Sequence, residues 1–177
     1  NRMSVHRAQR VLLLLVKLAL ITETFPPEIN GVALTFARLA RGLGKRGHVV
    51  SVFRPWRRDL LPPSAHEGYC EVALPGLPIP GYPLLRFGLP ARRRLRSLWK
   101  MARPDLVHVA TEGPLGASAV SAALDLGIPV SSSFHTNFHA YTKAYRWGLL
   151  SGLVLAWLRR VHNRTHLTLA PTRELCE

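Results

Sequence analysis

The side chains best suited to chemistry gather after the apolar run 129–134. His135 comes directly after this run, and Thr136, Asn137 and His139 follow within a few positions. Such closely spaced imidazole, hydroxyl and amide groups suit hydrogen bonding to the hydroxyls of a sugar. A zinc motif of the HExxH type would need glutamate at the position that Thr136 occupies. The spacing therefore favours a polar binding site without a metal ion, and the alternative is a histidine with only a structural role.

A second candidate site is the segment 22–33, which reads TETFPPEINGVA. Its Asn30-Gly31 pair stands where a helix is predicted to begin and leaves the backbone free of Cβ crowding. The free N–H groups and the dipole at a helix start favour an anion, above all a phosphate. The segment lacks both the GxGxxG fingerprint of dinucleotide sites and the Gly-Lys-Ser/Thr of a P-loop. The alternative is a plain turn closed by an Asn-Gly cap.

A third polar position is Glu112, in the segment 110–116, which reads ATEGPLG. It follows another apolar run and precedes a predicted helix. Its carboxylate has two candidate roles, binding a substrate hydroxyl or capping that helix. Capping is the more common role for an acidic residue at such a place.

These polar segments stand between apolar runs and helical patterns that alternate along the chain. Strands are predicted at 17–22, 48–53, 71–74, 106–110, 129–134 and 167–170, and helices at 32–43, 90–103, 115–126 and 149–162. The Pro- and Gly-rich segment 74–90 is predicted to be a loop. This alternation predicts an α/β fold with a Rossmann-like parallel sheet and helices on both faces. Ligands bind such sheets at the carboxyl ends of the strands, where all three polar segments lie.

The length of 177 residues fits one domain, and 47% apolar with 19% charged residues is typical of a globular chain. Two distant cysteines predict no disulfide framework and favour a reducing compartment. The apolar run 11–21 is too short to cross a bilayer, which needs about 20 residues. We expect residues 1–16 to be an extension and residues 17–177 to be one domain that is cut off before a further domain.

The net charge of +14 points to an anionic partner: a membrane surface, a nucleic acid or a phosphorylated small molecule. A genome that favours arginine is the alternative explanation. Aromatic residues do not interleave with the basic runs, which makes nucleic acid the less attractive partner. A non-enzymatic α/β domain that binds membrane or nucleic acid is nevertheless the alternative to an enzyme.

The predicted helix 90–103 separates basic from apolar residues. Its two faces carry Arg93, Arg96, Lys100 and Arg103 on one side, and Leu95, Leu98, Trp99 and Ala102 on the other. This pattern suits contact with anionic lipid headgroups. An ordinary surface helix with its apolar side in the core has the same pattern. Further residues that could extend the basic surface are Trp157, Arg159, Arg160 and Arg164.

Four segments together resemble the N-terminal domain of the retaining glycosyltransferases of family 4, which have the GT-B architecture. They are TETFPPEINGVA at 22–33, RPDLVHVATEGPLG at 103–116, SFHTNF at 133–138 and APT at 170–172. Each segment is short, but all four stand in the family's order, and the likeness runs from Lys17 to the end of the chain. The subgroup that looks most similar is that of bacterial mannosyltransferase-like enzymes that glycosylate lipids.

The resemblance implies a role for each candidate residue. The family's glycine loop approaches the donor diphosphate and matches Gly31, with Asn30 in place of the first of two glycines. The family's histidine near the donor sugar matches His135, which would orient the sugar and support charge at its anomeric carbon. The family's N-terminal domain mainly binds the acceptor, for which the candidates here are Glu23, Glu112, Thr136 and Asn137.

The resemblance also implies a longer enzyme that transfers a hexose from a nucleotide diphosphate sugar to a lipid or glycan hydroxyl, with retention of configuration. Mannose is the first candidate for the hexose. The chain would be inactive alone, because the family's C-terminal domain holds most of the donor pocket. No metal, other cofactor or nucleic-acid partner is expected. The expected location is the cytoplasm, with peripheral contact at the inner face of the cell membrane.

Overall fold

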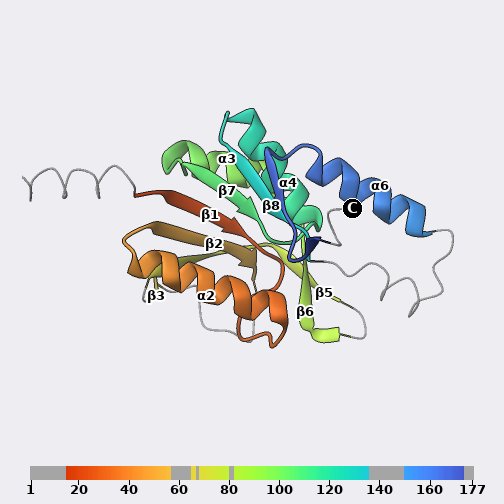
Figure 1. The fold of residues 1–177 in the computed structure, drawn as a ribbon, viewed down its shortest axis with the longest axis horizontal. Coiled ribbons are helices and arrows are strands. Elements are labelled where there is room, and N and C mark those ends of the chain that lie inside the picture. The colour runs from red at the N-terminus through yellow and green to blue at the C-terminus, as the bar shows by residue number, and fades with distance from the viewer. Residues whose placement is uncertain (1–14, 57–64, 67, 80–81, 136–149, 174–177) are drawn as a thin grey trace, which may run out of the picture.

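A seven-stranded sheet forms the centre of the computed structural model, which describes residues 15–56, 65–66, 68–79, 82–135 and 150–173 (Figure 1). Its strands are β1 (Lys17–Ile21), β2 (Val49–Pro55), β3 (Ala65–His66), β4 (Tyr69–Leu74), β7 (Leu106–Val109), β8 (Val130–Ser133) and β9 (Leu167–Leu169). The order is β3-β4-β2-β1-β7-β8-β9, and all pairs are parallel except β3 with β4. Without β3 this is the Rossmann order 3-2-1-4-5-6, which confirms the predicted fold class.

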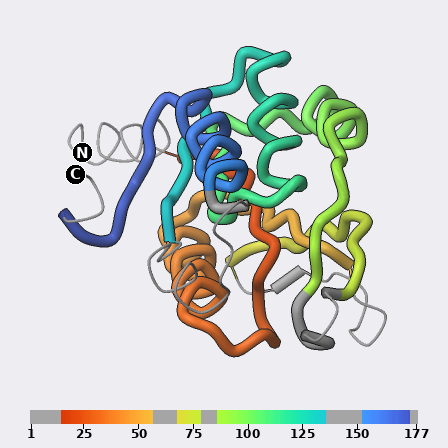
Figure 2. Tube along the Cα trace, turned by 90° about the vertical axis from the view of Figure 1, so that its right-hand side faces the viewer, coloured from red at the N-terminus to blue at the C-terminus, as the bar shows by residue number. Residues whose placement is uncertain are grey.

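Helices cover both faces of the sheet. They are α2 (Gly31–Lys45), α3 (Arg92–Met101), α4 (Pro114–Asp125) and α6 (Leu150–His162). Figure 2, which looks along the strands, shows α2 on one side of the sheet and the other three helices in a row on the opposite side. Each face therefore has its own apolar core, one around α2 and the other around α3 and α4.

The central strand β1 is buried on both faces. Leu18 and Leu20 belong to the core around α2, whereas Ala19 and Ile21 belong to the core around α3 and α4. The strand is nearly all apolar for this reason, as is usual in parallel sheets covered on both sides.

Helix α2 packs on the sheet mainly through small residues. Its buried residues are Ala33, Phe36, Ala37 and Ala40, whereas Leu39 is 41% exposed. Alanines dominate the buried side because the helix packs closely on the sheet. The helix ends at Lys45, two residues before Gly47, whose φ of 91° favours glycine.

The predicted loop 74–90 is wrong, because it contains the hairpin of β5 (Gly76–Ile79) and β6 (Tyr82–Gly88). The two strands form a separate two-stranded sheet, where a proline without an N–H group is tolerated. Gly76 pairs with Gly88, and a Cβ at either glycine would strike a neighbour, Pro55 or Leu115 respectively. The glycines that indicated a loop are therefore the places where the hairpin presses against the main domain.

Replacement of Gly88 by alanine should loosen this junction. The added Cβ would lie 2.5 Å from the Leu115 Cβ, so we expect Gly88→Ala to lower the free energy of unfolding by about 1–3 kcal/mol in urea denaturation. Gly152→Ala is the matched control, because nothing lies within 4 Å of that Cβ and alanine favours the helix. Equal stability of the two variants would contradict the proposed contact.

Candidate functional site

The carboxyl ends of β1 and β7 form the switch point of the sheet. From these neighbouring strands the chain leaves toward opposite faces, to α2 after β1 and to α4 after β7 (Figure 2). The two exits are joined, because the Ala110 N–H donates to the Ile21 carbonyl at 2.8 Å and the Glu23 N–H donates to Thr111 Oγ1 at 2.8 Å. Ligands of open α/β sheets bind at such a point, and the predicted polar segments 22–33 and 110–116 meet here.

Asn30 is the N-cap of α2. Its Oδ1 accepts from the Ala33 N–H at 2.8 Å, and its Nδ2 donates to Thr24 Oγ1, which in turn donates to Glu28. The Asn-Gly cap is therefore confirmed, and the Asn30 side chain is engaged within its own loop. A direct contact of this residue with a donor phosphate stays a prediction.

Gly31 opens the first turn of α2 to its surroundings. The residue is exposed, and a Cβ built on it would meet nothing within 4 Å. The described residues therefore leave this side of the helix start open, and the backbone dipole there favours an anion. The geometry is compatible with the predicted diphosphate contact and does not test it.

Glu23 is directed toward the protein interior. Its Oε2 accepts from the Gly88 N–H at 3.2 Å, and its Oε1 accepts from the Leu115 N–H at 3.1 Å. It thereby joins the end of β1 to the hairpin and to the first turn of α4. A Cβ at Gly113 would lie 2.0 Å from Glu23 Oε1, so a larger residue there would displace the carboxylate from this position.

The helix cap predicted for Glu112 is wrong. The N-cap of α4 is Gly113, which has no side chain, and the carboxylate at the start of this helix belongs to Glu23. The nearer glutamate instead faces α6: its Oε1 lies 3.2 Å from His162 Nε2, and its carbonyl accepts from Trp157 Nε1 at 2.7 Å. Acceptor binding by Glu23 or Glu112 stays a prediction. An acceptor would have to bind beside the contacts that these two residues already make within the protein.

His135 lies two residues beyond β8, at the same edge of the sheet. Its Nε2 is buried and has no hydrogen-bond partner among the described residues. Its ring meets the Phe36 ring edge-on, with centroids 5.3 Å apart. Burial lowers the pKa of His135, and the negative charge of Glu112 opposes that change. A neutral imidazole with an unused nitrogen is thus available at the carboxyl edge. Thr136 and Asn137 lie outside the described residues.

His108 is a polar residue of this region that the sequence reasoning missed. Its Nδ1 lies 2.9 Å from Ser131 Oγ and its Nε2 lies 2.9 Å from Ser133 Oγ, so both ring nitrogens are satisfied. Burial, and next the nearby His135, lower the pKa of His108 to about 4. Phe36 packs against both imidazole rings. The signal was a histidine inside the apolar strand β7, next to a strand that carries serines.

The described residues contain no group of three metal-binding side chains, and the absence of a metal requirement stays a prediction. They also contain no helix of the length and apolarity that a membrane crossing requires.

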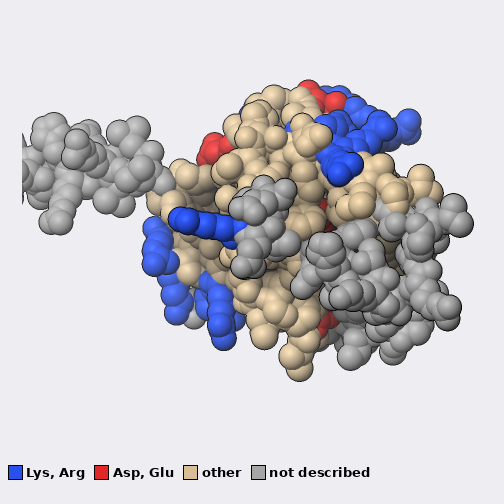
Figure 3. Space-filling model, turned by 45° about the vertical axis from the view of Figure 1, so that its right-hand side comes forward, with Lys and Arg blue, Asp and Glu red and all other residues tan. Residues whose placement is uncertain are grey.

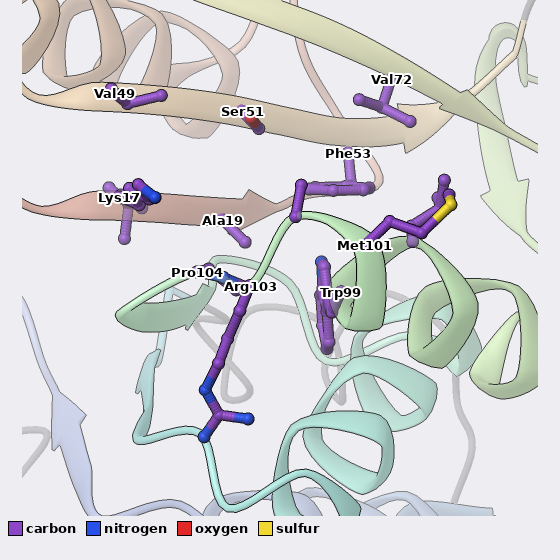
Figure 4. Close-up of a pocket in the computed structure, with 13 residues that line it drawn as sticks. Lys17, Ala19, Val49, Ser51, Phe53, Val72, Trp99, Met101, Arg103 and Pro104 are labelled. Atoms are coloured by element: carbon purple, nitrogen blue, oxygen red, sulfur yellow. The ribbon is translucent and has the colours of Figure 1, made fainter.

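A hollow of about 350 Å³ lies between α3 and the sheet, with Lys17, Trp99 and Arg103 among its lining residues (Figure 4). It opens near the amino ends of β1 and β2, at the edge opposite the switch point.

The titration of Glu23 should be visible in the stability of the protein. Burial raises the pKa of Glu23 from 4.5 to about 7, against the lowering effect of its backbone hydrogen bonds. The folded state therefore holds this proton more tightly than the unfolded state. Its contribution to stability is complete below pH 4.5 and is lost as the pH rises through about 7.

We expect Glu23→Gln to flatten the decline in unfolding free energy between about pH 5 and about pH 8, by about 1–3 kcal/mol. Guanidinium denaturation at both pH values measures the difference. A decline in the variant as steep as in the unmodified protein would show that another group titrates in this range.

The family model for Glycosyltransferase Family 4 matches residues 29–177. A GDP-mannose-dependent alpha-mannosyltransferase of Mycolicibacterium smegmatis is 32% identical over 164 residues, which are 92% of this chain and 44% of the relative. An alpha-monoglucosyldiacylglycerol synthase of Streptococcus pneumoniae is 27% identical over 135 residues, 76% of this chain and 30% of the relative.

A solved structure from Listeria monocytogenes, described as a UDP-N-acetylglucosamine 2-epimerase, aligns with a TM-score of 0.51 at 13% identity. It covers 90% of this chain and 40% of that one, and supports the fold alone. The chain spans less than half the length of these curated relatives. The match across most of the sequence is nevertheless decisive, and the chain belongs to glycosyltransferase family 4.

Proposed function

We propose that the full-length protein transfers a hexose, mannose in the first instance, from a nucleotide diphosphate sugar to a lipid hydroxyl with retention of configuration. The observation that carries this proposal is the pairing, at the switch point of a family 4 domain, of an open helix start at Gly31 with the unused nitrogen of His135. Phe36 of the same helix contacts the imidazole, so both groups belong to one packed unit.

The donor would lie with its diphosphate against the start of α2. The N–H groups of the first turn that Asn30 does not cap would suit the phosphate charge, and Gly31 leaves room for a close approach. His135 would then orient the sugar and support charge at the anomeric carbon as the bond to the diphosphate breaks. GDP-mannose is the first donor to test, because the mannosyltransferase relatives are named for it.

The acceptor would reach the same edge from the side of Glu23, Glu112, Thr136 and Asn137. A lipid hydroxyl is favoured because one relative is named for the synthesis of monoglucosyldiacylglycerol. No metal or other cofactor takes part in the proposed transfer. Turnover that persists in excess chelator would agree with this part of the proposal, and turnover that metal restores would contradict it.

We also infer that the enzyme works in the cytoplasm, at the inner face of the cell membrane, through α3. Leu95 and Trp99 bury the apolar side of this helix in the core, while Arg93 and Lys100 are exposed. Arg103 is not available for lipid, because it donates to the carbonyls of residues 126 and 127 at the end of α4. The basic side of α3 is therefore shorter than the sequence pattern indicates.

His135→Ala should reduce turnover strongly in the full-length enzyme. The variant loses the imidazole proposed to support charge at the anomeric carbon, so we expect kcat to fall about 100-fold or more. Release of nucleotide from GDP-mannose in the presence of a lipid acceptor measures the rate. Unchanged turnover would exclude the proposed role of His135, and inversion of the product anomer would exclude the proposed stereochemistry.

Gly31→Ala should separate donor binding from folding. Because a Cβ at Gly31 meets nothing within 4 Å, we expect thermal stability to stay the same or to rise slightly. The methyl group would nonetheless stand where the diphosphate is proposed to approach, so KM for the donor should rise about tenfold. Leu39→Ala on the exposed side of the same helix is the control. A variant with unchanged donor KM would place the diphosphate elsewhere.

A further inference from the structure

A second hollow lies on the helical face near the candidate site, between α4, α6 and the start of α3. Its volume is about 340 Å³. The residues that line it are Pro90, Arg92, Pro114, Ala117, Ser118, Val120, Ser121, Trp157, Arg160, Val161 and Arg164. The lining thus contains three arginines, two serines and an indole but no carboxylate. We refer to it as the arginine groove.

The charge of the arginine groove is only partly neutralised. Arg92 is paired with Asp125, to which it donates at 2.9 and 2.7 Å. Arg164 donates to Ser121 Oγ at 3.0 Å and is near enough to Asp125 to help lower the pKa of that carboxyl group, without pairing with it directly. No carboxylate of the described residues lies within salt-bridge distance of Arg160 or Arg164. Two cationic groups therefore face the hollow with charge left for an anion.

The side of the groove formed by α6 combines this charge with exposed apolar groups. Trp157 is 42% exposed and Leu153 is 69% exposed, and exposed Arg159 and Arg160 follow on the same helix. Figure 1 shows the first part of α6 extending beyond the carboxyl ends of the strands, and Figure 3 shows one group of Lys and Arg side chains at its upper right and another at its left. Such a helix resembles those that lie in the interface of an anionic membrane.

We propose that the arginine groove binds the phosphate-bearing headgroup of an anionic membrane lipid, with Trp157 and Leu153 placed in the interfacial layer. The choice of a lipid over other anions rests on the proposed function, the transfer to a lipid acceptor. A free phosphate would not account for the exposed apolar side of α6. The headgroup would occupy a place separate from the acceptor, because the groove lies on the helical face and not at the switch point.

Helix α6 connects the arginine groove with the candidate site through contacts to Glu112. Trp157, which lines the groove, donates to the Glu112 carbonyl at 2.7 Å. His162, which follows the groove-lining Val161 on α6, contacts the Glu112 carboxylate. A lipid held in the groove would therefore fix α6 against the loop that follows β7. This arrangement would turn the carboxyl edge of the sheet toward the bilayer that supplies the acceptor.

Flotation with vesicles tests the proposal in the intact chain. The vesicles are phosphatidylcholine alone or phosphatidylcholine with phosphatidylglycerol, and the variants are Arg160→Glu and Arg38→Glu. Both arginines are exposed on surface helices, and both variants change the net charge equally. We expect binding to anionic vesicles to fall about tenfold for Arg160→Glu and less than twofold for Arg38→Glu, which lies on α2 across the sheet.

Equal loss in both variants would overturn the groove in favour of diffuse electrostatic attraction. If glycerol phosphate in solution stabilises the chain against unfolding as much as anionic vesicles do, the lipid is excluded as the source of the phosphate. Oligonucleotide binding that Arg160→Glu abolishes, with vesicle binding intact, would assign the groove to nucleic acid. Unfolding curves confirm that both variants fold. Flotation does not measure sugar transfer. If the enzyme is inactive but Arg160→Glu still weakens vesicle binding more than Arg38→Glu does, only the proposed function is contradicted.

Discussion

The buried carboxylate of Glu23 is the constraint on which the switch point depends. It receives hydrogen bonds from the backbone at Gly88 and Leu115, so one side chain holds the end of β1, the hairpin and the start of α4 together. A carboxylate taken out of water is stabilised only by such hydrogen bonds. Gly88 and Gly113 admit it because neither presents a Cβ. The local geometry of the candidate site follows from this packing.

The remaining polar groups at the carboxyl edge are also held by specific partners. His108 lies between two serine hydroxyls, Asn30 closes the first loop, and Glu112 meets His162. Against this background the buried and unpartnered Nε2 of His135 is an exception among the described residues of the edge. Buried polar groups in proteins are nearly always satisfied. The proposed contact of His135 with the donor sugar would give this nitrogen a hydrogen-bond partner.

The basic character of the chain is divided between structure and surface. Arg103 and Arg92 mainly hold α3 against α4, the former through carbonyls and the latter through Asp125. Arg160 and Arg164 face a hollow without carboxylates. The net charge alone could not distinguish these uses. An arginine that no carboxylate pairs directly is the better candidate for contact with an anionic partner.

The sequence by itself determined the alternation of strands and helices, and with it the parallel sheet and the edge where ligands bind. These features follow from apolar periodicity and helix caps, which act over a few residues. It did not reveal the hairpin at 76–88, because Pro and Gly locally indicate a loop and become strand residues only when they press against Pro55 and Leu115. It also offered Glu112 as one candidate for the cap of α4, whereas the carboxylate at that helix start is that of Glu23.

Only the tertiary structure decided which side chains meet. Glu23 reaches partners 65 and 92 residues away in the chain, and His108 is satisfied by serines of the neighbouring strand. No local pattern encodes such pairs, because they depend on strand order and on the close approach of backbones that lack a Cβ. The same holds for the arginine groove, whose walls come from three helices.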